Sequence, residues 1–98
     1  MDDLQRSTEF EWDEGNQEKN LLRHGVHWQE CEEAFFDPER KVYPDPRHAH
    51  TEKRYLLLGK TLMARLLFIV FAIRRGRIRI ISARDLNKRE YPLYEKEA

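Results

Sequence analysis

The sequence predicts a small α+β domain, and three observations indicate that class. The chain has 98 residues, of which 40% are hydrophobic and 37% charged, so it suits one compact core and residues 1–98 are treated as a single domain. Apolar residues have helical spacing in the first third and strand patterns after residue 52. We expect a small antiparallel, meandering β-sheet with two N-terminal helices and a C-terminal helix.

The first third is expected to hold a short strand and the two helices. Residues 10–12 alternate apolar and polar side chains, and Asp13 is a typical N-cap for the helix that follows. That helix should end at Gly25, after a cationic last turn. A second helix should span residues 28–36 and stop before Pro38.

The β-sheet is expected from the following stretches. Strand patterns fall on residues 41–43, 54–58 (ending at Gly59), 66–73 and 77–82. Gly76 allows the tight turn of a hairpin between the last two strands. A terminal helix should cover residues 86–97, with Asn87 as a candidate cap and Pro92 as a point of kinking or shortening. The stretch 66–73 is apolar on both faces, so helices or a partner chain must cover both sides of it.

Export and membrane insertion are not expected. Residues 1–20 are charged and lack the apolar stretch of a signal peptide, and the longest apolar run has eight residues where a membrane span needs about twenty. The single cysteine, Cys31, excludes an internal disulfide framework and should be a small helix residue. These features favour a cytoplasmic protein.

The net charge of zero conceals a separation of charge along the chain. Residues 1–52 hold 14 acidic and 6 basic residues, and residues 53–98 hold 4 and 12, so the two parts carry −8 and +8. Two interpretations are open. The basic side of a bipolar surface could meet a polyanion, or the two parts could fold together and neutralise each other through ion pairs.

A basic face is expected on the last strand. Alternation places Arg77, Arg79 and Ile81 on one face, opposite to Ser82. The same face or its rim should also hold Arg54, Lys60 and Arg84, whose charges would suit phosphates. The alternative is a solvated face on which arginine stems pack against aliphatic side chains.

The loop before residue 52 contains groups that titrate near neutrality. His48 and His50 lie beside Arg47 and shortly before Glu52. RNA can be cut without a metal when a base removes the 2′-hydroxyl proton and cations stabilise the phosphate. The alternative is that these histidines are merely solvated. Neither a metal site nor a cofactor is expected, because the histidines lack further ligand spacing and no phosphate loop occurs.

Several short motifs occur in order along the chain. They are Phe10-Glu11-Trp12-Asp13, Asn20-x-x-Arg23-His24-Gly25-Val26, Asp45-x-Arg47-His48, Glu52-x-Arg54, Leu58-Gly59-Lys60-Thr61, Arg65-x-Leu67 and Ile78-Arg79-Ile80-Ile81-Ser82-Ala83-Arg84. Together they resemble the BrnT toxin family over nearly the whole chain. The turn at 23–26 and the strand at 78–84 are the most specific of them.

The resemblance implies a fold similar to RelE-type ribonuclease toxins and metal-independent endoribonuclease activity that arrests translation and growth in the bacterial cytoplasm. It also implies a BrnA-type antitoxin with a ribbon-helix-helix DNA-binding part, so that operator DNA is bound only through the antitoxin. A different class remains open, namely a non-catalytic RNA- or protein-binding module of the same fold.

Site residues follow by position in the resemblance. Glu52 or His48 is the expected general base, and the expected phosphate and transition-state clamps are Arg54, Arg79 and Arg84. The residues expected to steer RNA are Arg47, Lys60 and Arg77.

The chain departs from the family pattern at four positions. These are Asn16, Ala72, Tyr91 and Pro92. The Tyr91-Pro92 change thins the basic face beside the terminal helix, which leaves open that cleavage is weak or lost while antitoxin binding persists.

Overall fold

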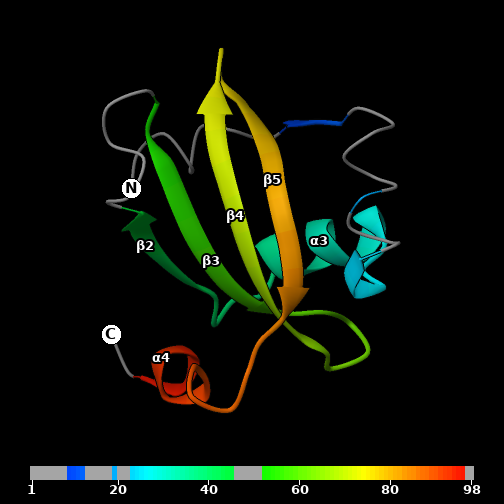
Figure 1. The fold of residues 1–98 in the computed structure, drawn as a ribbon, viewed down its shortest axis with the longest axis vertical. Coiled ribbons are helices and arrows are strands. Elements are labelled where there is room, and N and C mark those ends of the chain that lie inside the picture. Colours follow the sequence, from blue (N-terminus) through cyan, green and yellow to red (C-terminus); the bar gives the residue numbers. More distant parts are fainter. Residues whose placement is uncertain (1–8, 13–18, 20–22, 46–51, 97–98) are drawn as a thin grey trace.

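The computed structural model describes residues 9–12, 19, 23–45 and 52–96, and a five-stranded sheet forms its centre. The strands are β1 (Glu9–Glu11), β2 (Lys41–Asp45), β3 (Arg54–Lys60), β4 (Leu66–Arg74) and β5 (Arg77–Asp85), in the spatial order β1-β5-β4-β3-β2 (Figure 1). The helices are α3 (Trp28–Phe35) and α4 (Tyr91–Glu95). The predicted α+β class with a mainly antiparallel sheet is confirmed.

The edge strand β1 departs from the predicted meander. Strands β2 to β5 pair antiparallel in chain order. Strand β1 instead pairs in parallel with β5, with Glu9 opposite Arg77 and Glu11 opposite Arg79. The purely antiparallel sheet was therefore wrong at this edge, because three alternating residues identify a strand but not its partner.

The helices agree with the prediction in part. The first predicted helix, from Asp13 to Gly25, lies mainly outside the described residues. The second is confirmed as α3, which ends at Phe35.

The C-terminal helix is shorter than predicted, with five residues. Asn87 and Glu90 exchange side-chain to backbone hydrogen bonds of 3.0 and 3.1 Å, but these close the turn before α4 instead of capping a longer helix. Pro92 lies in the first turn of α4, where its missing N–H is not needed, so it marks the beginning of the helix and not a kink.

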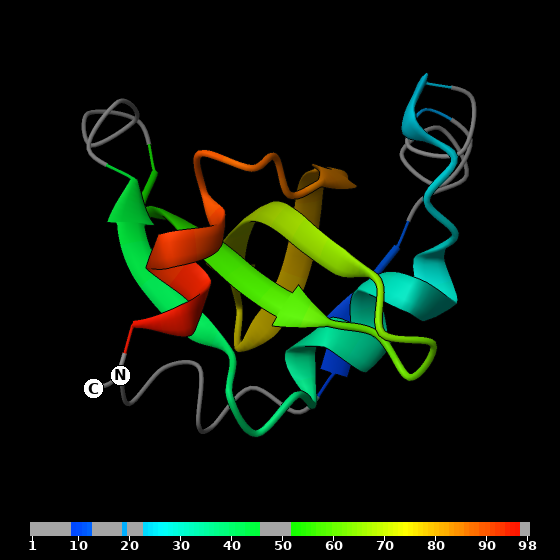
Figure 2. The same cartoon turned by 90° about the horizontal axis from the view of Figure 1, so that it is seen from below.

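Helices α3 and α4 cover opposite faces of the sheet (Figure 2). On the α3 side, Ala34 and Phe35 pack into a core with Ile69, Phe71 and Ile80. On the other side, the α4 residue Tyr94 packs with three residues of the sheet and its C-terminal extension: Leu58, Phe68 and Leu86. The prediction that β4 is covered on both faces is confirmed, and α4 supplies part of the second cover.

Gly59 lies inside β3 and does not end it. A Cβ atom at this position would lie 2.5 Å from the carbonyl oxygen of Ala34 in α3. The glycine therefore lets the helix approach the sheet closely. The predicted strand end was wrong because this glycine serves packing and not a turn.

The connection between β4 and β5 has the two residues Arg75 and Gly76. Their φ angles are 52° and 74°. Two positive φ angles are typical of a type I′ turn, whose twist matches that of the strands it joins. The predicted hairpin is confirmed.

A bulge in β5 changes the predicted faces of that strand. Phe71 lies opposite Ile80, and Val70 lies opposite Ser82, so Ile81 is an extra residue. Val70 and Ala72 project from the same face of β4, and they lie opposite Ser82 and Arg79 respectively. Ser82 and Arg79 therefore project from the same face of β5. The predicted assignment of Ser82 to the other face was wrong.

Candidate functional site

The predicted arginines lie on the sheet face that α4 partly covers. We call this the arginine face and define it by Arg54, Arg79 and Arg84. Residues directly opposite each other on adjacent strands project from the same face. The register places Arg54 of β3 and Arg79 of β5 on either side of Ala72 in β4. With strands about 4.8 Å apart, the two arginine Cα atoms are separated by about 10 Å.

Glu52 lies at the same end of the arginine face. Its carboxylate accepts hydrogen bonds of 2.8 Å from both Nε and Nη2 of Arg74 and lies 3.6 Å from Nε of Arg54. The hydrogen bonds from Arg74 hold the pKa of Glu52 below its ordinary value. Glu52 is therefore a carboxylate at neutral pH, with both oxygens engaged.

Two of the predicted residues lie at the other end of the arginine face, beside α4. Arg84 donates hydrogen bonds of 2.8 and 2.7 Å to Glu90, and its guanidinium carbon lies 4.0 Å from the ring centroid of Phe68. Lys60 is about 20 Å from Arg54 along the extended strand β3. The predicted residues therefore form two groups and not one site.

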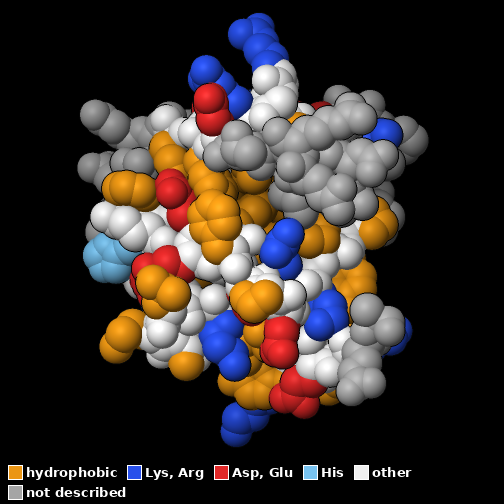
Figure 3. Space-filling model, turned by 180° about the vertical axis from the view of Figure 1, so that it is seen from behind, with side chains coloured by type: hydrophobic (Ala, Val, Ile, Leu, Met, Phe, Trp, Pro, Cys, Tyr) orange, Lys and Arg blue, Asp and Glu red, His pale blue; other side chains and the backbone are white. Residues whose placement is uncertain are grey.

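Carboxylates from the acidic part of the chain accompany the arginines of the basic part. The ion pairs are Arg65–Glu30 (3.1 Å), Arg74–Glu52 (2.8 Å), Arg77–Glu9 (3.2 Å) and Arg79–Glu11 (3.3 Å). On the face shown in Figure 3, acidic, basic and apolar side chains are interspersed. The described residues thus favour mutual neutralisation of the two parts over a bipolar surface.

Three predicted residues lie outside the described residues, within the segment 46–51. They are Arg47, His48 and His50, and their roles stay predictions. The described residues on either side place the ends of that segment: Asp45 is directly across the strand pair from Arg54, and Glu52 lies beside Arg54. The residues that flank the segment, Asp45 and Glu52, therefore lie at the Arg54 end of the arginine face.

Arg65 was not predicted as an important residue, yet it joins two of the family motifs. Its guanidinium group donates to Asp85 (2.6 Å) and Glu30 (3.1 Å), and to the carbonyl oxygens of His24 (3.1 Å) and Gly25 (2.9 Å). These contacts tie the turn at 23–26 to the beginning of β4 and to α3. The sequence contains both the turn at 23–26 and the Arg65-x-Leu67 motif, but their separation along the chain does not indicate that Arg65 contacts the turn.

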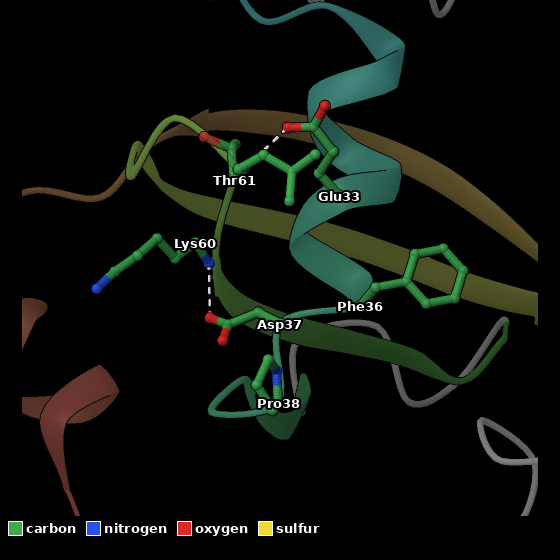
Figure 4. Close-up of a pocket in the computed structure, with 7 residues that line it drawn as sticks. Glu33, Phe36, Asp37, Pro38, Lys60 and Thr61 are labelled. Carbon is green, nitrogen blue, oxygen red and sulfur yellow. Dashed lines mark hydrogen bonds between the residues drawn. The ribbon is translucent and has the colours of Figure 1, made fainter.

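A pocket lies where the end of α3 meets the end of β3 (Figure 4). Its lining is Glu33, Phe36, Asp37, Pro38, Lys60, Thr61 and Leu62. The backbone N–H of Lys60 donates to Asp37 (2.8 Å), whereas the Lys60 side chain points away from the pocket in Figure 4. Among the described residues, Lys60 alone of the predicted site lines it, so the pocket is separate from the Arg54–Arg79 group.

Cys31 is fully buried in α3, and burial raises its pKa to about 12. The side chain is thus an uncharged thiol at neutral pH, and the expectation of a small helix residue is confirmed. The described ranges contain no group of three or more potential metal ligands. No helix among the described residues is long and apolar enough to cross a membrane.

The fold is that of a small α+β domain with a five-stranded, mainly antiparallel sheet. It resembles a crystal structure of the ribonuclease toxin BrnT from Brucella abortus, with a TM-score of 0.63. Sequence identity is 19%, and the match covers 82% of this chain and 97% of that chain. At this identity the likeness shows the fold alone.

The family is shown by the sequence. A family model described as ribonuclease toxin, BrnT, of type II toxin–antitoxin system matches residues 12–90. The chain therefore belongs to the BrnT family of ribonuclease toxins, and type II membership implies an antitoxin partner. A comparison with curated proteins gives no match.

Proposed function

We propose that this chain is a toxin that cuts RNA as a metal-independent endoribonuclease and thereby inhibits translation and growth. The observation that carries the proposal is the row in which Arg54 and Arg79 flank Ala72, with Glu52 beside Arg54. Two cations separated by a small residue leave room for a phosphate between them. Family membership supports RNA as the polymer.

The proposed reaction is transfer of the phosphate within the RNA chain. A base, Glu52 or His48, removes the 2′-hydroxyl proton, the 2′ oxygen bonds to phosphorus, and the bond to the 5′ oxygen breaks. The 5′ oxygen takes a proton from water as it leaves, which gives a 2′,3′-cyclic phosphate and a 5′-hydroxyl end, and the protonated base returns its proton to the solvent. Arg54 and Arg79 stabilise the charge that grows on the phosphate oxygens, the role that a metal ion plays in other enzymes.

The other predicted residues take roles at the margins of this site. Arg47 and Arg77 steer RNA towards the Arg54 end of the arginine face. Lys60 and Arg84 act at the α4 end, where Arg84 first has to exchange Glu90 for a phosphate.

The proposed partner is a BrnA-type antitoxin with a ribbon-helix-helix DNA-binding part, which contacts operator DNA on behalf of the complex. Residues 1–98 act as one RelE-type toxin domain in the cytoplasm, where RNA and antitoxin are both present. Co-expression tests this partnership: we expect growth arrest by the chain alone and normal growth with the adjacent antitoxin gene. Equal growth in both cultures would contradict it.

The enzymatic proposal is tested by incubating labelled RNA with purified protein in excess EDTA. We expect the parent to make products in molar excess over itself, and a folded Glu52→Ala, Arg79→Ala double variant to make none. The matched control is Lys88→Ala, Arg89→Ala, because both side chains are exposed on the turn before α4. Circular dichroism establishes that each variant is folded.

A second function is favoured by one observation, namely that Arg77, Arg79 and Arg84 already have carboxylate partners. This pairing suits a non-catalytic RNA- or protein-binding module, because arginines already engaged with carboxylates are less available to stabilise the charge of a transition state. Stoichiometric protection of RNA without products by the parent would support this module. Products that appear only with added divalent metal would contradict metal independence.

A further inference from the structure

The ion pair with Glu52 joins a residue of the Glu52-x-Arg54 motif to Arg74, which belongs to none of the sequence motifs. Arg74 is the last residue of β4 and binds Glu52 side-on, through Nε to Oε2 and Nη2 to Oε1, both at 2.8 Å. Two parallel hydrogen bonds fix the plane of the guanidinium group as well as its position. The Arg74 side chain therefore has a defined direction.

Arg74 projects from the arginine face. It follows Ala72 by two residues on β4, so the two side chains share a face, and Ala72 lies between Arg54 and Arg79. The Glu52 carboxylate also lies 3.6 Å from Arg54 Nε, which is buried and has no hydrogen-bond partner. One carboxylate thus holds guanidinium groups from two neighbouring strands.

Further charged groups around this cluster come from the two edge strands. Asp45 of β2 lies directly opposite Arg54, and Glu11 of β1 is close enough to raise the pKa of Arg74 together with Glu52. Both lie opposite arginines of the arginine face, so acidic side chains flank this cluster from both edges of the sheet.

One edge of the Arg74 guanidinium group remains outside the ion pair. The bonds to Glu52 use Nε and Nη2, and Nη1 takes no part in them. The Arg74 side chain is 41% exposed, compared with 23% for Arg54 and 25% for Arg79. A ligand from solvent therefore reaches Arg74 more readily than either predicted clamp.

We propose that Arg74 binds a phosphate of the RNA next to the scissile one, and that Glu52 is the positioning residue that holds Arg74 and Arg54. This inference rests on the proposed function, because it assumes RNA as the ligand. It removes Glu52 from the role of general base, since both of its carboxylate oxygens are engaged by guanidinium groups. A carboxylate held by two cations is also a weak base.

Binding is measured without cleavage by using a 2′-O-methyl RNA oligonucleotide, which lacks the 2′-hydroxyl proton. We expect Arg74→Ala to weaken binding about tenfold and to reduce the slope of log K against log salt by about 0.7, the value for one phosphate on a single strand. Arg74→Lys should retain most of the salt dependence, because lysine keeps the positive charge. It should bind RNA more weakly than the parent, because lysine lacks the planar guanidinium group with its paired donors.

The matched control is Arg75→Asn, which removes the same charge one residue away. Arg75 is exposed with a positive φ that asparagine tolerates, so the turn should be kept. We expect parental affinity and slope from this variant. If the parent binds and cleaves RNA and Arg74→Ala binds it as tightly as the parent, the inference about Arg74 is wrong and the proposed function stands. A parent that neither binds nor cleaves RNA would overturn the inference and the proposed function together.

The positioning role of Glu52 is tested by the pH dependence of cleavage. Glutamine still accepts a hydrogen bond from arginine, so Glu52→Gln should retain more than about a tenth of kcat and the acid limb of the parent's profile. A loss of 100-fold or more in kcat together with disappearance of that limb would identify Glu52 as the base. Circular dichroism again separates either result from unfolding.

Discussion

Arg65 and Arg74 lie at the two ends of β4 and have opposite surroundings. Arg65, immediately before the strand, donates to two carboxylates and two carbonyl oxygens. Arg74, the last residue of the strand, meets one carboxylate, Glu52, through one edge of its guanidinium group. The number of acceptors thus distinguishes Arg65, whose contacts are all within the fold, from Arg74, for which we propose a phosphate ligand.

The hydrogen-bond partners of Arg84 and Arg54 can be compared in the same way. Arg84 bonds Glu90 through both terminal nitrogens and packs on Phe68, which resembles the Arg65 arrangement. Arg54 shares the Glu52 carboxylate with Arg74, although its own Nε is buried and has no hydrogen bond. The Arg54 end of the arginine face is therefore expected to hold the reacting phosphate, and the Arg84 end to contribute mainly to stability and only at the margin to RNA binding.

The largest effect is expected for Arg65→Ala. Its removal leaves Glu30, Asp85 and two carbonyl groups without their donor, which should lower the free energy of unfolding by about 2–4 kcal/mol. Urea denaturation measures the change. The exposed Arg89→Ala should alter stability by no more than about 0.5 kcal/mol. Equal values for both variants would contradict a structural role for Arg65.

At the Arg54 end of the arginine face, Arg79→Ala should lower the rate of RNA cleavage by about 100-fold, which corresponds to about 2.7 kcal/mol of transition-state stabilisation. Its stability should change by less than about 1 kcal/mol, because the pair with Glu11 is partly exposed and spans 3.3 Å. Initial rates and thermal melts of the same preparation provide both numbers. A folded variant with the full cleavage rate would remove Arg79 from the site.

Gly59→Ala tests the packing of α3 on the opposite face. The added Cβ meets the carbonyl oxygen of Ala34 and should cost about 1–3 kcal/mol of stability, since backbone atoms have to move. Gly76→Ala is the matched control, because open space surrounds it and only its positive φ opposes the change. We expect a loss near 1 kcal/mol there. A smaller loss at Gly59 than at Gly76 would refute the close approach.

A smaller effect is expected for Tyr94→Phe in α4. The Tyr94 hydroxyl donates to Asp37, and its removal should cost about 1 kcal/mol, because backbone N–H groups of Glu39 and Lys60 still satisfy the carboxylate. Chemical denaturation provides the value. Cleavage should be unchanged, since α4 covers the Arg84 end of the arginine face. A large loss of cleavage would show that α4 supports the Arg54 end as well.

The smallest effects should appear on acidification. Arginine hydrogen bonds lower the pKa of Glu52, Asp85 and Glu90 in the folded state, led by Arg74, Arg65 and Arg84 respectively. Carboxylates of this kind stabilise the fold above their ordinary pKa, and the contribution is lost as pH falls through the lower folded pKa. Stability should therefore decrease from about pH 6 to about pH 3.

Glu90→Gln isolates the contribution of one carboxylate to the loss of stability at low pH, because glutamine does not titrate. Denaturation curves over that pH range should show a weaker dependence on pH for this variant than for the parent. An identical dependence would exclude the pair with Arg84 as a source of the acid effect.

Most of the secondary structure was predictable because its signals are local. The alternating residues of β5, the positive φ at Gly76 and the helical spacing of α3 each lie within a few neighbouring residues. The misplaced features depend on distant contacts. Gly59 is predicted to end its strand unless its close contact with Ala34 of α3 is known. Ile81 is predicted to belong to a regular strand unless the register of β5 with β4 is known.

The candidate site was predictable in composition but not in grouping. The sequence indicated Arg54 and Arg79, and the register brings them together across Ala72. It also indicated Lys60 and Arg84, which lie at the far end of the same face. Arg74 was predicted only as part of the turn between the last two strands and not as a site residue, because no family motif includes it.

The sequence alone determined the α+β class, the hairpin, the helical position of Cys31 and the family motifs, because each depends on residue type and short-range spacing. The tertiary structure decided which carboxylate meets which arginine. Glu11 and Arg79 are 68 residues apart, and Glu30 and Arg65 are 35 apart. Such pairs form only when sheet register and helix packing bring the two oppositely charged parts of the chain together, so no local pattern records them.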